Sequence, residues 1–338
     1  MSLAHTQPEI PAVPAHKGRR LPLRVGTRGS PLALVQTRAF LDVITRFCPV
    51  LRTPFLGDTP VFQEHVIRTT GDAEQTRRLA EIGGKGLFAK EIHEAMLDGR
   101  IDFAVHSLKD LETSLPDGIV LACTLKREDA RDALIFGHGC GAYDADDPLA
   151  CLPARAVIGT ASVRRQAQLL HHRPDLRIAL LRGNVLTRLE RTERGDFAAS
   201  LLALAGMRRL GLEHRAGAAL DAWFMVPAAC QGIVGVTVRA ADQELRELLG
   251  GIEDPEARAV STAERSMLAL LDGSCRTPIG GYARLLEDGS LHLTGLVARE
   301  DGSFLARRWL SGAPADAMRI GAELGAALRA DSPADLFA

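Results

Sequence analysis

Five arginines stand where a predicted strand gives way to a predicted helix: Arg28, Arg164, Arg165, Arg182 and Arg188. A guanidinium group is suited to bidentate contacts with carboxylates or phosphates. A cation at the start of a helix also opposes the helix dipole, so it needs an anionic partner. Any one of these arginines could pair with a surface Asp or Glu, but the five together indicate a site for a ligand with several carboxylates.

Phosphate is the other obvious anion, and the glycine-rich segments do not favour it. The segment Gly83–Gly86 is not a P-loop, because it lacks the upstream glycine and has Gly86 where Ser or Thr would bind magnesium. The segment Gly137–Gly141 has no dinucleotide fingerprint either. A phosphate-transferring enzyme is therefore poorly supported.

Two further groups could do chemistry beside these cations. Asp110 follows Lys109 at the end of a predicted strand. A carboxylate among cations would be held ionised, and it could stabilise a developing cation or hold a ligand N–H, although a plain turn aspartate is the other interpretation. Cys275 lies in a glycine-bounded turn, where it is either a small buried hydrophobe or a nucleophilic attachment point.

The elements that must position these residues follow an α/β pattern from Leu21 onward. Short apolar strands end in Gly, Ser or Thr turns and lead into amphipathic helices. In the first unit, Ser30 and Pro31 are the predicted N-cap and first residue of a helix to Phe47. The other expected strands cover residues 23–27, 64–69, 101–105, 156–159, 176–181 and 198–202, with helices at 87–97 and after Ser162 and Asn184.

After Asp254 the pattern changes to an antiparallel α+β arrangement. One long helix is expected to Leu271, followed by three strands and a last helix over 315–329. Asp-Gly turns at Asp288 and Asp301 predict that hairpins join the three strands. Residues 1–20 form a polar, proline-containing tail that we expect to be disordered.

Composition narrows the class of protein. The 338 residues exceed one domain of roughly 100 to 200 residues. A net charge of −1 argues against binding to nucleic acid or an anionic membrane, and no apolar run reaches the ~18 residues of a membrane span. The six cysteines form no C-x-x-C pair, so we expect no metal site. The first 20 residues lack a secretory signal pattern, which predicts a cytoplasmic protein.

Seven ordered motifs closely resemble the porphobilinogen deaminase (hydroxymethylbilane synthase) family, over Leu21 to about Arg329. The motifs are Thr27–Leu34, Ile82–Phe88, Val105–Asp110, Gly159–Gln166, Leu181–Val185, Ala205–Gly211 and Gly273–Gly280. The resemblance implies two doubly wound α/β domains like those of type II periplasmic binding proteins, plus a small C-terminal α+β domain. The implied domain bounds are 21–125 with 227–249, 131–221 and 254–330, and residues 70–86 would form a mobile loop over the site.

The resemblance also implies the activity. Such enzymes are transferases of haem biosynthesis that join four porphobilinogen molecules into hydroxymethylbilane, with release of ammonia. The chain grows on a covalent dipyrromethane cofactor, one per chain, which Cys275 would hold by a thioether.

By the same resemblance, Asp110 would be the catalytic carboxylate and Arg28 would bind and take part in proton transfer. The residues that would bind cofactor or substrate are Ser30, Lys85, Phe88, Lys109, Thr160, Ser162, Arg164, Arg165, Arg182, Arg188 and Arg209. Porphobilinogen would be the only partner, with no nucleic acid or membrane, and the expected state is a monomer.

Several positions depart from the usual family pattern. Ala161 replaces a common serine, Leu111-Glu112 replaces a frequent Val-Pro, Cys230 replaces a glycine and could oxidise, and Thr53–Val61 looks inserted. The main alternative is a non-catalytic carboxylate-binding protein of the same two-lobed fold. Such a protein would carry a signal peptide or a DNA-binding segment, and it would need neither Cys275 nor the third domain.

Overall fold

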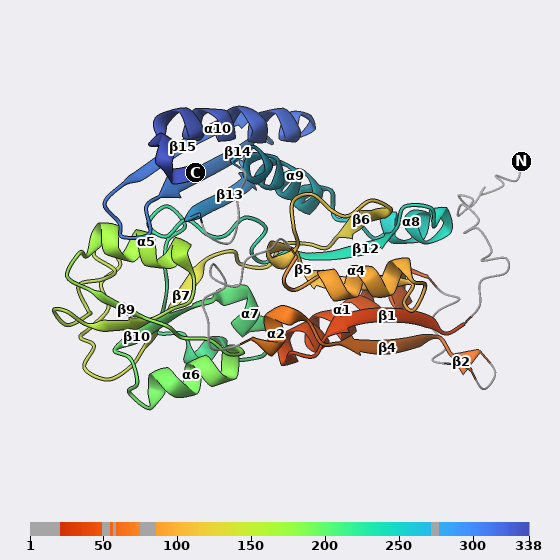
Figure 1. Cartoon of the computed structure of the whole chain (residues 1–338), viewed down its shortest axis with the longest axis horizontal. Helices are drawn as coiled ribbons and strands as arrows, with labels where there is room; N and C mark the ends of the chain where they lie inside the picture. Colours follow the sequence, from red (N-terminus) through yellow and green to blue (C-terminus); the bar gives the residue numbers. More distant parts are fainter. Residues whose placement is uncertain (1–20, 49–54, 57–58, 75–85, 272–276, 338) are drawn as a thin grey trace, which may run out of the picture.

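The computed structural model describes residues 21–48, 55–56, 59–74, 86–271 and 277–337. Two five-stranded sheets with their helices lie at opposite ends of the long axis, and a three-stranded sheet with two helices lies along the upper side (Figure 1). This arrangement confirms the predicted fold class of two α/β units and a small α+β unit. The tail expected at residues 1–20 lies outside the described residues.

The first sheet has the strand order β4-β1-β5-β12-β6. Its strands are β1 (Leu23–Arg28), β4 (Phe62–Ile67), β5 (Phe103–Ser107), β6 (Ile119–Thr124) and β12 (Val234–Arg239). β1 runs parallel to both β4 and β5, whereas β12 is antiparallel to β5 and β6. The carboxyl ends of β1 and β5 therefore meet at one edge, which is where ligands bind in open α/β sheets.

The second sheet has the order β11-β7-β10-β8-β9. Its strands are β7 (Asp132–Phe136), β8 (Val157–Gly159), β9 (Arg177–Ala179), β10 (Ala199–Ala203) and β11 (Ala218–Ala219). β8 is parallel to β9 and β10, and β7 is antiparallel to β10 and β11. β7 thus enters this sheet with its first residue at the end where β10 finishes.

The helices begin where the sequence places their caps. Ser30, Ser162, Asn184 and Asp254 each accept a hydrogen bond from a backbone N–H of the first turn that follows. The α-helices are α1 (Pro31–Phe47), α2 (Thr70–Ala73), α4 (Lys90–Leu97), α5 (Val163–His172), α6 (Val185–Glu193), α7 (Leu204–Arg209), α8 (Gln243–Gly250), α9 (Pro255–Leu270) and α10 (Ala317–Asp331). Short 3-10 helices cover Leu108–Asp110, Glu213–Arg215, Pro314–Asp316 and Ala334–Phe337. None of the described helices is long and apolar enough to cross a membrane.

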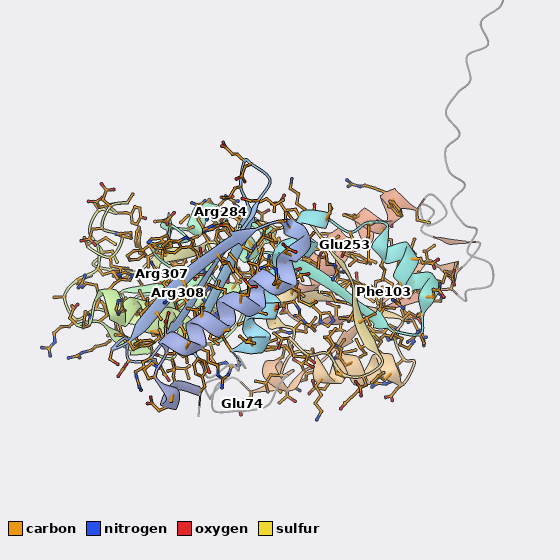
Figure 2. All side chains as sticks on the ribbon, turned by 90° about the horizontal axis from the view of Figure 1, so that it is seen from above. Glu74, Phe103, Glu253, Arg284, Arg307 and Arg308 are labelled. Carbon is orange, nitrogen blue, oxygen red and sulfur yellow. The ribbon has the colours of Figure 1, made fainter. Side chains whose placement is uncertain are left out.

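The third sheet is an antiparallel meander of β13 (Ile279–Leu285), β14 (Leu291–Ala298) and β15 (Leu305–Gly312). The Asp-Gly turns join these strands as predicted, since both Gly289 and Gly302 have positive φ. Figure 2 shows helix α10 from above. Arg307 and Arg308 of β15 lie on the left of this view, and Phe103 of the first sheet lies on the right.

Some predicted boundaries were wrong. The strands expected at 64–69 and 101–105 lie at β4 and β5, each displaced by about two residues, because the buried Phe103 and the partly buried Phe62 pack in the first core. The segment expected as a loop from Thr70 begins as helix α2. The segment that looked inserted, Thr53–Val61, includes the two short antiparallel strands β2 (Phe55–Leu56) and β3 (Thr59–Pro60).

The three units have separate apolar cores, but the third core reaches into the first sheet. Phe40 and Phe103 make an edge-to-face contact in the first core, with ring centroids 5.6 Å apart. The core under the three-stranded sheet also contains Leu108 and Leu111, which flank Asp110. The turn that carries Asp110 is therefore packed against the α+β unit.

Glu264 of α9 is a buried carboxylate that connects separate segments of the chain. Its Oε1 lies 2.6 Å from Nη1 of Arg127, and the backbone N–H groups of Cys230 and Ala283 also donate to it. The side chain is 0% exposed, so these contacts replace all of its hydration. Removing one partner of such a pair leaves an uncompensated buried charge.

We predict that Glu264→Leu lowers the free energy of unfolding by ~3–5 kcal/mol, because Arg127 loses its counter-ion. Urea unfolding followed by circular dichroism measures this. Arg319→Ala is the matched control, since Arg319 pairs with Asp316 and Glu323 on the surface and should change stability by only ~0–1 kcal/mol. Equal losses in the two variants would contradict the role of Glu264.

Candidate active site

The Arg28 cluster consists of Arg28, Asp72, Phe88 and Asp110, which meet at the edge where β1 and β5 end. Nη1 of Arg28 lies 3.0 Å from Oδ2 of Asp110, and Nη2 lies 2.6 Å from Oδ1 of Asp72. The ring of Phe88 stacks under the same guanidinium, 4.0 Å from its Cζ to the ring centroid. Sequence reasoning placed Arg28, Phe88 and Asp110 at one site, and the structure brings these three together.

Two carboxylates hold the Arg28 cation in place. Burial opposes its charge, but the hydrogen bonds and charges of Asp72 and Asp110 outweigh burial and raise the pKa of Arg28. Burial likewise opposes ionisation of Asp72, and Arg28 outweighs it and lowers the pKa of that carboxyl. Asp110 remains partly exposed, at 30% of its side chain, so its carboxylate is fixed by Arg28 yet open to a ligand.

A close backbone approach positions Asp72. The N–H of Gly71 donates to the carbonyl of Leu87 at 2.9 Å. A Cβ on Gly71 would lie only 2.3 Å from the Phe88 ring, so only glycine allows this contact. Nη2 of Arg182 donates to the Gly71 carbonyl at 3.2 Å, which links the second α/β unit to helix α2.

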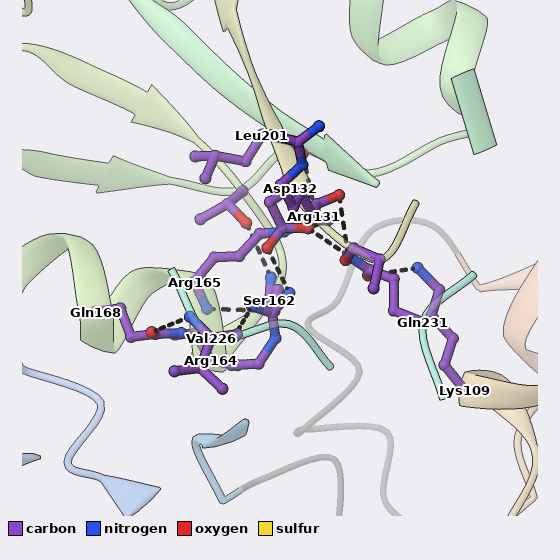
Figure 3. Close-up of polar contacts among 12 residues, drawn as sticks. Lys109, Arg131, Asp132, Ser162, Arg164, Arg165, Gln168, Leu201, Val226 and Gln231 are labelled. Carbon is purple, nitrogen blue, oxygen red and sulfur yellow. Dashed lines mark hydrogen bonds and ion pairs between the residues drawn. The ribbon is translucent and has the colours of Figure 1, made fainter. Parts of the chain in front are cut away.

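The Asp132 network consists of Asp132, Arg164, Arg165 and Gln231, and Figure 3 shows it converging between the two lobes. The two carboxylate oxygens of Asp132 lie 2.8 Å from Nη2 of Arg164 and 2.7 Å from Nη2 of Arg165. Nε2 of Gln231 donates to the same carboxylate at 2.8 Å. Desolvation opposes ionisation of Asp132, but the two arginines outweigh it and hold its pKa below the ordinary range.

This network corrects one step of the sequence argument. The position of Arg164 and Arg165 at a helix start requires an anionic partner, and the five arginines together favoured a ligand for that role, but for these two Asp132 is a partner within the protein. Both arginines are buried, and both also donate to carbonyls, those of Val226 and Leu201 respectively. Of the donors of Arg165, Nε is buried without a hydrogen-bond partner among the described residues.

Lys109 joins the two groups of residues. Its Nζ donates to Oε1 of Gln231 at 3.2 Å, and Asp110 follows it directly (Figure 3). The side chain has an exposed surface, yet protein atoms crowd it on most sides. This desolvation lowers the pKa of Lys109 to about 8, against the opposite influence of Asp110. With a pKa of about 8, the ammonium group keeps most of its charge at neutral pH.

Positive charge is in excess beside Asp110. Desolvation and the repulsion of Arg165 and Arg182 lower the pKa of Arg188 to about 10. Nε of Arg188 donates to the carbonyl of Gly183 at 2.8 Å, so a backbone oxygen holds the side chain. Neighbouring cations destabilise one another's charged form, and an anionic ligand would relieve this repulsion.

Four of the other predicted binding residues form hydrogen bonds within the protein. Ser30 and Ser162 cap α1 and α5 through their hydroxyl groups. The hydroxyl of Thr160 is buried and accepts from the N–H of Ser162 at 3.1 Å. Arg209 donates to the carbonyl of Gly232 at 2.6 Å. Cys275 and Lys85 lie outside the described residues.

Sequence reasoning missed Asp72, Asp132 and Gln231. Asp72 lies in a polar segment that was expected to be a loop. The sequence Thr-Thr-Gly-Asp directly after a strand could have indicated a polar residue at the edge of the sheet. Asp132 begins a strand that was not predicted, so nothing indicated that its side chain faces Arg164.

Cys230, which was expected to be able to oxidise, is 2% exposed. Its backbone is left-handed, with φ of 62°, where a glycine is favoured. Desolvation and the charge of Glu264 raise the pKa of the thiol, so burial and protonation argue against oxidation.

Comparison with known proteins finds two family models that match this chain. The model described as "Porphobilinogen deaminase, dipyromethane cofactor binding domain" matches residues 23–247, and "Porphobilinogen deaminase, C-terminal domain" matches residues 259–330. The chain is 46% identical to "Porphobilinogen deaminase" of Nitrobacter hamburgensis over 90% of this chain and 92% of that protein. It is 44% identical to the protein of that name from Paracoccus denitrificans, over 94% of this chain and 96% of that one.

A plant protein is comparably similar. "Porphobilinogen deaminase, chloroplastic" of Oryza sativa subsp. japonica is 44% identical over 83% of this chain and 75% of its own length. Among solved structures, the periplasmic VFT2 domain of Bordetella pertussis BvgS aligns with 71% of this chain and 92% of its own, at 13% identity and a TM-score of 0.38. That global likeness is too weak to define the fold by itself.

Both family models and relatives at 43–46% identity over most of the chain give the same result. With the Arg28 cluster at the edge of the first sheet, they establish that the chain belongs to the porphobilinogen deaminase family.

Proposed function

We propose that this chain condenses four porphobilinogen molecules into hydroxymethylbilane and releases ammonia at each step. The observation that carries the proposal is the contact of Arg28 with Asp110, 3.0 Å apart, next to an excess of cations that includes Lys109 and Arg188. Porphobilinogen carries two carboxylates and a pyrrole N–H. The cations suit the carboxylates, and Asp110 suits the N–H.

In this proposal Asp110 is the catalytic carboxylate. Its partly exposed oxygen accepts a hydrogen bond from the pyrrole N–H of the substrate. When ammonia leaves, the ring becomes positively charged, and a fixed carboxylate stabilises that charge without reorganisation. Arg28 orients the carboxylate, and its second carboxylate partner, Asp72, keeps the guanidinium from neutralising Asp110 completely.

The residues present fit a cofactor with several carboxylates. Dipyrromethane, when bound, supplies the pyrrole carbon from which the product chain is extended. Arg182 and Arg188 would hold its carboxylates, because burial and the repulsion of Arg165 and Arg182 disfavour the charge of Arg188, and an anionic ligand would stabilise that charge. We assign its covalent attachment, as a thioether, to Cys275, and we assign Lys85, Ser30, Thr160, Ser162 and Arg209 to binding of cofactor or substrate.

Arg164 and Arg165 have a different place in the proposal. Asp132 already neutralises much of their charge, so they orient the Asp132 network, while the nearby exposed Lys109 is available to a ligand. Phe88 holds the guanidinium of Arg28 by stacking and offers its ring edge to a pyrrole.

The domain organisation belongs to the same proposal. We divide the chain into residues 21–125 with 227–249, 131–221 and 254–330, a division supported by the presence of β12 in the first sheet. A cytoplasmic monomer is the state we propose, with porphobilinogen as its small-molecule partner. The alternative of a non-catalytic carboxylate-binding protein is not favoured, because the family match includes the C-terminal domain.

The first prediction concerns Cys275. Native protein should have an intact mass equal to the polypeptide plus one dipyrromethane, and it should react with Ehrlich's reagent, because a thiolate forms a stable thioether. Cys275→Ser should have the bare polypeptide mass and no turnover, whereas Cys140→Ser should keep the added mass. Active native protein at the bare polypeptide mass would refute the attachment.

The second prediction concerns Asp110. Asp110→Asn should fold and load the cofactor, yet its kcat should fall by about 10²-fold or more, because a neutral amide does not stabilise the developing cation. The assay is hydroxymethylbilane formation, with cofactor loading checked by intact mass. Asp98→Asn, an exposed carboxylate at the end of α4, is the control and should leave kcat unchanged. Near-normal turnover by Asp110→Asn would end the assignment.

The third prediction concerns Arg188. Arg188→Leu should raise KM for porphobilinogen or reduce cofactor loading by roughly 10- to 100-fold, the effect of one hydrogen bond to a charged group. Steady-state kinetics and intact mass together measure both. Arg194→Leu, an exposed arginine at the end of the same helix, should leave both unchanged. If the two variants behave alike, Arg188 has no part in binding.

A further inference from the structure

A buried contact between an imidazole and a carboxylate lies directly behind the turn that carries Asp110. Nδ1 of His93 on α4 is 3.2 Å from Oε1 of Glu112, and the two side chains are only 2% and 10% exposed. His93 Nδ1 has no hydrogen-bond partner within the described chain, because the two groups are not aligned for one. His93 Nε2 and Glu112 Oε2 are also buried without a hydrogen-bond partner among the described residues. Replacing such a buried pair by apolar side chains is often neutral, so net stability does not account for it, whereas removing one partner alone is costly.

Glu112 is nevertheless held in its charged form. Desolvation opposes ionisation, but His93, a backbone N–H and the charge of Arg265 outweigh it and lower the pKa of Glu112. The ring of His106 on β5 lies 5.8 Å from the His93 ring and bonds to Thr237. His93 therefore has one carboxylate beside it and a second imidazole on its other side.

The pair closes a ring of contacts through the Arg28 cluster. Asp110 contacts Arg28 at 3.0 Å, and Arg28 stacks on Phe88 at 4.0 Å. Phe88 leads into α4, which carries His93, and His93 contacts Glu112, two residues beyond Asp110. Each side of Asp110 is thus connected to the same helix, once through Arg28 and once through Glu112.

Two further contacts fix this arrangement. A Cβ on Gly86 would lie 3.2 Å from Oε1 of Glu112, so the carboxylate packs against the backbone just before Phe88. Nη2 of Arg265 on α9 donates to the carbonyls of Glu112 at 2.7 Å and Thr113 at 3.0 Å. The backbone after Asp110 is held by α9, and the Glu112 side chain ties it to α4.

We propose that Glu112 and His93 are a positioning pair, which fixes the Asp110 turn to helix α4 and so sets the place of the Asp110 carboxylate opposite Arg28 and Phe88. The inference rests on the proposed catalytic role of Asp110. Glu112 is one of the positions at which this chain departs from the usual family pattern. The pair acts through Asp110 and does not touch the reacting atoms.

The test uses the cofactor-loaded enzyme and the isosteric variant Glu112→Gln. Losing the charge loosens the turn, so kcat should fall by about 10-fold or more while KM stays within about two-fold, since a 1 Å displacement of a catalytic group can cost ~10²-fold. Amide hydrogen exchange of residues 108–113 should become faster, a direct measure of the lost tether that does not depend on turnover.

Two controls separate positioning from general stability. Glu94→Gln removes the exposed partner of Lys90 on the same helix and should change neither kcat nor hydrogen exchange. The double variant His93→Gln/Glu112→Gln should be no slower than Glu112→Gln alone, because the two residues act as one unit.

Unchanged kcat in Glu112→Gln, or a loss that only follows its fraction of unfolded protein, would overturn the positioning role. So would unchanged exchange at residues 108–113. Asp110→Asn separates this failure from that of the proposed site. If Asp110→Asn is inactive and Glu112→Gln is normal, only the positioning pair is wrong, whereas an active Asp110→Asn removes the catalytic assignment itself.

Discussion

This structure depends on one constraint: guanidinium groups that are partly removed from water must be neutralised by anions. Where burial is complete, the protein supplies the anion itself, as Asp132 does for Arg164 and Arg165. Beside Asp110 the balance is different, because burial and then the repulsion of neighbouring arginines lower the pKa of Arg188 to about 10. The space next to Asp110 therefore favours a ligand with several carboxylates, and the same repulsion gives that ligand its binding energy.

Local signals in the sequence located about half of the site. Ser30 with Pro31 marked the start of α1, and the rule that parallel strands end at one edge brought Arg28 and Asp110 together correctly. The partners of these residues were not predictable in the same way. Asp132 faces Arg164 because β7 enters the second sheet antiparallel, and Gln231 arrives from a segment about a hundred residues further along the chain.

The missed residues share a physical cause. Residue type and spacing report local structure, whereas ion pairs between distant segments depend on topology. For Arg164 and Arg165, the dipole argument was sound in requiring an anion, but it could not tell a ligand from an internal carboxylate. For the fold, the hairpin turns and helix caps were predicted well because they depend on a few adjacent residues. β7 and β12 were missed because nearly all of their residues are buried, and such strands lack an alternating pattern. β6 was missed as well, and its partly buried residues do not alternate with buried ones either.

Helix α9 brings these constraints together. Glu264 fixes its middle to Arg127 and the backbone of Cys230, and the next residue, Arg265, holds the carbonyls that follow Asp110. Leu108 and Leu111, on either side of Asp110, pack into the core that α9 shares with α10. A displacement of the α+β unit would therefore move the Asp110 turn with it. Because α9 ends at Leu270, five residues before Cys275 in the sequence, the helix that holds the backbone after Asp110 also leads along the chain to the proposed attachment point.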